Sequence, residues 1–246
     1  MSRLLLIRHG QATFSPHLEQ AFEDYDRLSE LGLRQSRALG EELASAGVLF
    51  DRVYGGPLER QRQTAEAVAE AYAQQSKPWP GITELPELAE HQGSRVVRHA
   101  LSSEPEHEQA LHRLSSRAGG DGQDVERMRM YFTIFRRVTR QWARGEIVPP
   151  DVPESWQAFR ARVGVGVARV LAEAGRGATV AAFTSGGPVG STVAWALGLN
   201  DEQALELAWL VENATVTELL FSEGQVSLKS FNAQPRLGAS DMVTGV

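Results

Sequence analysis

An arginine and a histidine stand side by side near the start of the chain, at Arg8 and His9. A histidine imidazole can take up a phosphoryl group as a nucleophile, and an arginine guanidinium offers a fork of N–H donors that matches phosphate or carboxylate oxygens. The pair therefore points to phosphoryl transfer through a phosphohistidine. The same two residues at a strand end can also make ordinary local hydrogen bonds, so the rest of the chain must decide.

Two apolar runs, Leu4 to Ile7 and residues 178–183, predict buried strands, and residues 50–54 predict a short strand between them. Each of the three ends at a loop with polar or glycine residues. A strand–helix alternation of this kind predicts an α/β fold, a three-layer sandwich in which a mainly parallel central sheet has helices on both faces. Residues 216–221 and 226–231 predict a hairpin or two adjacent strands at the C-terminal edge.

Helices are predicted between these strands. Ser29 is a suitable N-cap for a helix that ends near Gly47, and Pro57 precedes a helix over residues 58–75. Two further helices are expected, one over residues 155–174 and one that ends near Leu199. We interpret the whole chain, residues 1–246, as a single α/β domain.

A helical insertion at about residues 95–148 is expected to form a cap on that domain. From His91 to Gly145 it carries ten arginines against six acidic residues. Two interpretations stay open: a solvated helical face whose arginines pair with nearby carboxylates, or a basic surface that overhangs a site and favours an anionic substrate.

The composition excludes several classes of function. The net charge of −6 argues against general affinity for nucleic acids, and no stretch is apolar for long enough to span a membrane. The absence of cysteine excludes disulfides, thiolate metal sites and cysteine nucleophiles, and it makes the cytoplasm the simplest expectation for location. No metal and no cofactor are predicted, and the sequence does not indicate an oligomeric state.

Chemistry-bearing residues converge where the strands end. In an open parallel sheet, ligands bind beyond the carboxyl ends of the strands. The first strand delivers Arg8 and His9, and the second leads to Arg60 in the first turn of a helix. The third leads to the glycine-rich turn from Thr184 to Pro188, where free N–H groups at a helix N-terminus suit an oxyanion.

These motifs resemble those of the histidine phosphatase superfamily, the phosphoglycerate-mutase-like group. The segment from Arg8 to Ala12 (RHGQA) is similar to its signature loop, and the segment from Gly56 to Ala65 (GPLERQRQTA) to its second motif. The stretch from Leu28 to Gln35 resembles the segment that the family places between them.

The resemblance implies roles for individual residues. His9 would take up the phosphoryl group, with Arg8 and Arg60 as catalytic arginines that also bind phosphate. The remaining phosphate-binding residues would be Gln11, Ser185 and Gly186. The acid that protonates the leaving group would be Glu87, which follows a leucine by two positions, with Glu84 and Glu90 as alternatives.

Two positions depart from the family pattern. The family places a second histidine where this chain has Ser185, and a serine can donate one hydrogen bond but cannot carry positive charge. Gln61 stands where the family has an alanine. His91 and the arginines of the insertion are candidates to compensate for the missing histidine.

The function expected from the resemblance is that of a phosphoric monoester hydrolase. It would hydrolyse a small phosphorylated substrate through phospho-His9 without a metal. Two alternatives remain: a module that binds phosphate or a phosphoprotein with little turnover, which Ser185 favours, and a phosphoglycerate-type mutase. The identity of the substrate cannot be predicted from these residues.

Overall fold

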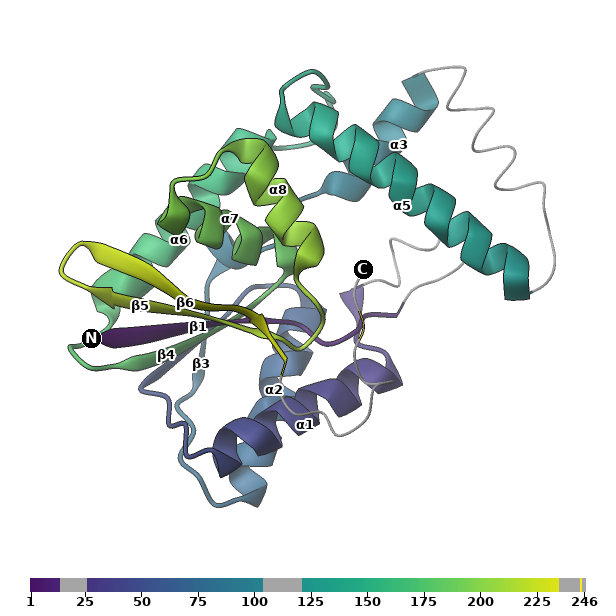
Figure 1. Cartoon of the computed structure of the whole chain (residues 1–246). Helices are drawn as coiled ribbons and strands as arrows, with labels where there is room; N and C mark the ends of the chain where they lie inside the picture. Colours follow the sequence, from purple (N-terminus) through teal and green to yellow (C-terminus); the bar gives the residue numbers. More distant parts are fainter. Residues whose placement is uncertain (14–25, 104–120, 235–243, 245–246) are drawn as a thin grey trace.

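The computed structural model describes residues 1–13, 26–103, 121–234 and 244. Its centre is a twisted sheet with helices on both sides (Figure 1). None of the helices in these ranges combines the length and apolar character that crossing a bilayer requires. The predicted α/β architecture is confirmed.

Six strands of the described chain form one sheet, in the order β3-β2-β4-β1-β5-β6. β1 (Ser2–Arg8) lies parallel to β4 (Thr179–Thr184), which lies parallel to β2 (Arg52–Gly55). β5 (Val216–Ser222) runs antiparallel to β1, and β6 (Gln225–Ala233) pairs with β5 as the predicted hairpin. The sheet is therefore mainly parallel with an antiparallel C-terminal edge.

Alternate residues of β1 belong to two different cores because successive side chains of a strand point to opposite faces. Leu4 and Leu6 pack in one apolar cluster with Trp156 and other residues of the helices above the sheet in Figure 1. Leu5 and Ile7 pack in the other, with Leu39 and its neighbours below the sheet. This burial on both faces explains why β1 reads as a continuous apolar run.

The predicted helices occupy these two layers. α1 (Glu30–Ser45) and α2 (Glu59–Gln74) cover one face, and α6 (Trp156–Glu173) and α7 (Gly186–Leu197) cover the other (Figure 1). Ser29 caps α1, as predicted, by accepting a hydrogen bond from the N–H of Gly32.

Three short elements are absent from the sequence-based expectation. β3 (Ile82–Glu84) is an exposed edge strand, and η2 (Pro86–Leu88) is a single 3₁₀ turn that follows it. α8 (Asp201–Leu210) begins at a capping box formed by Asn200 and Gln203. All three lie in segments to which the sequence analysis assigned no element.

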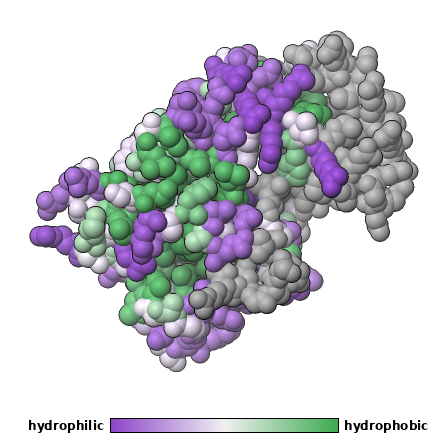
Figure 2. Space-filling model, in the orientation of Figure 1, coloured by the Kyte–Doolittle hydropathy of each residue, from purple (hydrophilic) through white to green (hydrophobic). Residues whose placement is uncertain are grey.

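The predicted insertion at residues 95–148 falls on two helices, α3 (Gly93–Ser103) and α5 (Asp121–Ala143). Residues 104–120 lie outside the described part, and with them Arg113 and Arg117. Near its C-terminal end α5 packs on α8, and hydrophilic side chains gather on the surface where these helices lie (Figure 2). The division of the chain into one domain with an insertion stays a prediction.

Candidate active site

The carboxyl ends of β1 and β4 hold the nucleophile candidate between them. Arg8 pairs with Thr184 in the parallel register, and the next residue, His9, donates its backbone N–H to the carbonyl of Thr184 at 2.9 Å. Asn213 donates a side-chain N–H to the carbonyl of His9 at 3.2 Å. His9 is thus fixed through its backbone from both sides, and it is 1% exposed.

The ring of His9 has a defined tautomer. Nδ1 lies 2.7 Å from the carbonyl oxygen of Gly10, which can only accept, so Nδ1 carries the hydrogen in the neutral ring. Nε2 then keeps its lone pair, and the Nε–H of Arg60 donates to it at 3.1 Å. The unprotonated nitrogen of the ring therefore faces a guanidinium, the side chain that phosphate oxygens favour.

The charge state of His9 follows from its surroundings. Burial, with further effects from the nearby guanidinium groups of Arg60 and Arg8, holds the pKa of His9 well below its ordinary value of 6.5. The hydrogen bond to the Gly10 carbonyl acts in the opposite direction and does not reverse the shift. The imidazole is therefore neutral at pH 7, which is the state a nucleophile needs.

The two predicted arginines meet this histidine from different elements. Arg60, in the first turn of α2, is 6% exposed and forms an ion pair with Asp26, with Nη1 at 2.9 Å from Oδ1. Arg8 is 3% exposed and donates to the carbonyl of Val211. The structure therefore brings Arg8, His9 and Arg60 together as the motifs predicted.

The N-terminus of α7 is the second part of the site. Ser185 is its N-cap residue, and both Ser185 and Gly186 are buried. A Cβ on Gly186 would lie 2.8 Å from the carbonyl oxygen of Ala208, so close packing leaves no room for a side chain there. These positions agree with the predicted convergence of the third strand end on the same edge.

The three glutamates proposed as acids lie in different surroundings. Glu84 is exposed at the end of β3. The Cβ of Glu87 packs against Gly166 of α6, where a Cβ on the glycine would approach it to 2.6 Å, and Oε2 of Glu87 has no hydrogen-bond partner among the described residues. Glu90 instead accepts from the N–H of Gly187 at 3.0 Å. The structure brings Glu90, rather than Glu87, to the N-terminus of α7.

His91 packs beside Glu90 within an aromatic cluster of Trp142, Trp156 and Phe159. Its Nδ1 accepts from the N–H of Gly93 at 3.0 Å, so Nε2 carries the hydrogen, 3.6 Å from Oε1 of Glu90. The backbone N–H of His91 also donates to Oε1 of Glu90 at 2.8 Å. His91 is therefore a neighbour that orients Glu90.

Gln11 is held by hydrogen bonds of both its backbone and its side chain. Its N–H donates to Oε1 of Gln35 at 2.8 Å, and its own Oε1 accepts from the hydroxyl of Ser29 at 2.9 Å. Gln35 also donates to Thr244, a residue near the other end of the sequence. The structure thus ties Gln11 to α1 and to its N-cap residue Ser29, and the predicted contact of Gln11 with phosphate stays a prediction.

Four contacts at the site have no counterpart in the sequence analysis. Asp26 pairs with Arg60, Asn213 holds the His9 carbonyl, and the hydroxyl of Thr64 accepts from the N–H of Gly10 at 3.1 Å. Gln61 donates from Nε2 to the hydroxyl oxygen of Ser185 at 2.8 Å. Gln61 had a visible signal as a departure from the family pattern, and Thr64 had one as part of the second motif, whereas Asp26 and Asn213 are of residue types that are common in loops and helices.

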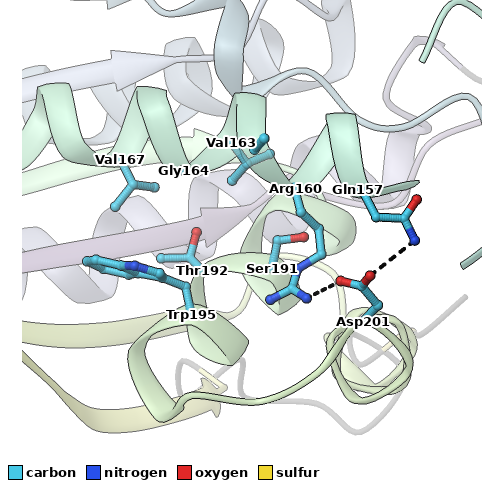
Figure 3. A pocket seen from close by; sticks show the side chains of 10 residues that line it. Gln157, Arg160, Val163, Gly164, Val167, Ser191, Thr192, Trp195 and Asp201 are labelled. Carbon is cyan, nitrogen blue, oxygen red and sulfur yellow. Dashed lines mark hydrogen bonds and ion pairs between the residues drawn. The ribbon is translucent and has the colours of Figure 1, made fainter. Parts of the chain in front are cut away.

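A separate hollow of about 210 Å³ lies between α6 and α7 (Figure 3). It is lined by Val163, Trp195 and Thr192, among others. The guanidinium of Arg160 at its edge is already paired with the carboxylate of Asp201. The lining of this hollow includes one arginine and no histidine, whereas the strand ends place two arginines beside His9, so the chemistry suited to phosphoryl transfer belongs to the strand ends.

Among the residues that the structure describes, no three histidine, aspartate or glutamate side chains group in a way that could hold a metal ion. The positive charge at the strand ends comes from Arg8 and Arg60, which stand beside the neutral imidazole of His9. This arrangement can accept a phosphoryl group on Nε2 while guanidinium N–H groups bind its oxygens.

Comparisons with known proteins identify relatives of this chain. The curated phosphoglycerate mutase of Rhizobium meliloti (strain 1021), described as 2,3-bisphosphoglycerate-dependent, is 36% identical over 74 residues. The match covers 30% of this chain and 35% of that protein, so it spans about a third of the relative's length.

Solved structures match over nearly the whole chain. A structure described as a putative α-ribazole-5′-P phosphatase from Escherichia coli has a TM-score of 0.61 at 20% identity and covers 95% of this chain and 98% of that one. A mycobacterial glucosyl-3-phosphoglycerate phosphatase has a TM-score of 0.61 at 21% identity, with coverage of 94% and 99%. At these identities the likeness concerns the fold.

Residues 4–130 and 111–234 also match the family model of the histidine phosphatase superfamily (branch 1), and the chain therefore belongs to that superfamily.

Proposed function

We propose that this protein is a phosphatase that hydrolyses a small phosphomonoester through a phosphohistidine on His9, without a metal ion. The observation that carries the proposal is the state of His9: a buried, neutral imidazole whose Nε2 lone pair faces the guanidinium of Arg60. In the first step Nε2 attacks phosphorus, and the bond between phosphorus and the leaving oxygen breaks. In the second step water attacks the phosphorus, and inorganic phosphate leaves His9.

Arg60 and Arg8 supply the charge that this transfer needs. The Nε–H of Arg60 now donates a hydrogen bond to Nε2 of His9. Once Nε2 forms its bond to phosphorus, this N–H can donate to a phosphoryl oxygen instead. Because both arginines are buried, their attraction for the developing negative charge is only weakly screened by solvent. Asp26 pairs with Nη1 of the same guanidinium and keeps the Nε–H of Arg60 directed at the histidine.

We propose Glu90 as the residue that protonates the leaving oxygen, in place of Glu87. The geometry supports this because the carboxyl of Glu90 accepts from the N–H of Gly187 in the first turn of α7, whereas Glu87 packs against α6. A carboxyl in its protonated form would give its hydrogen to the departing alkoxide and then accept one from the attacking water.

The experiment that tests the nucleophile is a rapid quench with phosphorus-labelled aryl phosphate. The trapped phosphoprotein should be labile in acid and stable in base, and it should be absent in His9→Ala. Excess chelator should leave turnover unchanged. Label that survives acid, or that persists without His9, would contradict the proposal.

A phosphoglycerate mutase is the second candidate, and the identity to the Rhizobium meliloti mutase favours it. The two activities separate in one assay with 3-phosphoglycerate and 2,3-bisphosphoglycerate. A mutase would form 2-phosphoglycerate, whereas a phosphatase would release inorganic phosphate. A module that only binds phosphate would do neither, and its affinity would depend on Arg60 without any turnover.

A further inference from the structure

Three helices in the described part of the chain have a serine as their N-cap residue, and one of these serines does not cap its helix. The hydroxyl oxygens of Ser29 and Ser155 accept hydrogen bonds from the N–H three residues on, at Gly32 and Ala158. The side chain of Ser185 makes no such bond to α7. Its hydroxyl is therefore available for another purpose.

The sequence after Ser185 explains this difference. The third residue of α7 is Pro188, which has no N–H to give to a capping oxygen. The N–H of Gly187 is taken by the carboxylate of Glu90. The first turn of α7 is thus capped from another part of the chain, and Ser185 is released from the capping role.

Gln61 holds the released hydroxyl in one orientation. Its Nε2 donates to Ser185 Oγ at 2.8 Å and to the carbonyl of Leu88 at 3.2 Å, and its Oε1 accepts from the N–H of Leu58 at 3.2 Å. If the amide oxygen and nitrogen were exchanged, two donors would face each other at Leu58 and two acceptors at Leu88. These two contacts therefore place the nitrogen of the amide, and not its oxygen, against Ser185.

The amide of Gln61 also has little room to move. Both Gln61 and Ser185 are 0% exposed. A Cβ on Gly56 would lie 2.1 Å from Oε1 of Gln61, so the amide fills the space that the glycine leaves open. Gln61 is therefore a rigid donor to Ser185, one residue after Arg60 on the same helix.

A serine oxygen that accepts from an amide keeps one hydrogen to donate. Among the described residues, Ser185 Oγ accepts from Gln61 and donates to no other group. We propose that Gln61 is a positioning residue that directs the Ser185 hydroxyl hydrogen to the phosphoryl group transferred to His9. This inference rests on the proposed function. In this inference Gln61 and Ser185, both neutral, together supply a hydrogen-bond donor at the position where the family has a histidine.

Accepting from Gln61 also makes the hydroxyl a better donor, because hydrogen bonds in a chain polarise one another. The strength of one such bond sets the expected effect. Loss of about 1 kcal/mol at the transition state lowers the rate by about fivefold to tenfold.

The test is a double-mutant cycle with Gln61→Met, which matches glutamine in length without its amide, and Ser185→Ala. Each single variant should lower kcat/KM for an aryl phosphate by about fivefold to tenfold and weaken inhibition by vanadate, a probe of the phosphoryl transition state. The double variant should lose no more than Ser185→Ala alone, because Gln61 acts through Ser185.

Gln61→Glu sharpens the cycle. A carboxylate at this position accepts from Ser185, so the hydroxyl hydrogen turns away from the phosphoryl group. Gln61→Glu should therefore lower kcat/KM more than Gln61→Met does. This difference between the two variants should become smaller when both are combined with Ser185→Ala, although the added charge is still present there. An unchanged difference would show that charge alone is responsible and would overturn the inference.

Gln157→Met is the matched control, since the amide of Gln157 also donates to two acceptors but lies at the hollow between α6 and α7. It should leave kcat/KM unchanged. Additive losses for Gln61→Met and Ser185→Ala would contradict the positioning role while the phosphatase proposal stands. If the wild type has no turnover that depends on His9, the proposed function fails. The affinities of the same variants for inorganic phosphate then test the Gln61 proposal, with additive losses for Gln61→Met and Ser185→Ala again counting against it.

Discussion

Arg60 of α2 and Arg140 of α5 are the same side chain in two opposite surroundings. Arg60 is buried, and it donates to His9 and pairs with Asp26. Arg140 is 43% exposed, pairs with Glu206 of α8 and stacks over the ring of Trp209. The first guanidinium is directed at a group that does chemistry, and the second joins two surface helices.

The contrast resolves part of the question left by the arginine-rich insertion. Arg140 and Arg144 pair with Glu206 and Glu202 of α8, and Arg136 also stacks over Trp209. For these arginines the interpretation as a solvated helical face holds. A count of charges along the sequence does not separate the two kinds of arginine, because only burial and partners distinguish them.

The largest effect is expected from removing the buried charge. Arg60→Ala should lower kcat/KM for an aryl phosphate by about 10³-fold, since it removes a guanidinium that stabilises charge developing on the phosphoryl oxygens. Arg140→Ala should leave kcat/KM unchanged. Steady-state kinetics of the two variants side by side measures the contrast. Equal losses would show that α5 contributes to the site after all.

The two glutamates make the next comparison. Glu90→Gln should lower the rate by about 10²-fold, as loss of a general acid does, and more for an alkyl phosphate than for an aryl phosphate with a good leaving group. Glu87→Gln should have a much smaller effect on kcat and should act mainly through stability, since the Cβ and Cγ of Glu87 pack against Gly166 of α6. A leaving-group dependence that changes in Glu87→Gln and not in Glu90→Gln would restore the original assignment.

Ser185→His tests how tightly the second part of the site is packed. The imidazole would have to enter space that the amide of Gln61 fills, and overpacking of a buried site costs about 1–3 kcal/mol in free energy of unfolding. Adding Gln61→Ala should return part of that loss. Denaturant unfolding of the single and double variants measures it. A Ser185→His protein as stable as the wild type would show that the site can make room.

The low pKa of His9 gives a pH dependence to stability. Above pH 6.5 the imidazole is neutral in both states. As the pH falls below 6.5, the unfolded chain binds a proton that the folded protein does not, so the free energy of unfolding decreases. The slope contributed by one such group is about 1.4 kcal/mol per pH unit, until the pH reaches the folded pKa.

His9→Asn should remove this contribution. The measurement is the difference between wild-type and His9→Asn unfolding free energies over the range from pH 6.5 downward, which cancels the other titrating groups. A difference that does not change with pH would mean that folded His9 titrates normally, and the argument for a neutral nucleophile would lose its basis.

The sequence predicted those parts of the fold and site whose pattern is local. The apolar run before Arg8 is continuous because both faces of β1 are buried, and Ser29 is a cap with its partner three residues away. Elements without such a pattern were missed. β3 is three exposed residues with no burial to constrain their types, and α8 has a weak apolar periodicity although its capping box is complete.

The site could be predicted only as far as its motifs extend. Arg8, His9 and Arg60 lie at strand ends and helix starts, where local sequence determines direction. Glu87 and Glu90 follow a leucine by the same spacing, and only the position of α7 and α6 around the turn distinguishes them. The Gln61–Ser185 contact joins residues 124 positions apart, so no spacing in the sequence could reveal it.

The smallest effect is expected for the pair between α5 and α8. Arg140 and Glu206 are both about half exposed, so their attraction is weakened by solvent and by the entropy of holding two long side chains. A double-mutant cycle with Arg140→Ala and Glu206→Ala should give a coupling of about 0.5 kcal/mol in free energy of unfolding. It should fall toward zero at 1 M salt, where the screening length is about 3 Å. Arg140→Ala also removes the stacking of Arg140 on the ring of Trp209, whereas Glu206→Ala keeps it. The single variants therefore differ by this stacking, and the cycle measures the coupling between Arg140 and Glu206. A coupling that persists at high salt would mean that the contact is shielded from solvent as Arg60 is, and the contrast between the two arginines would then be one of partner rather than of burial.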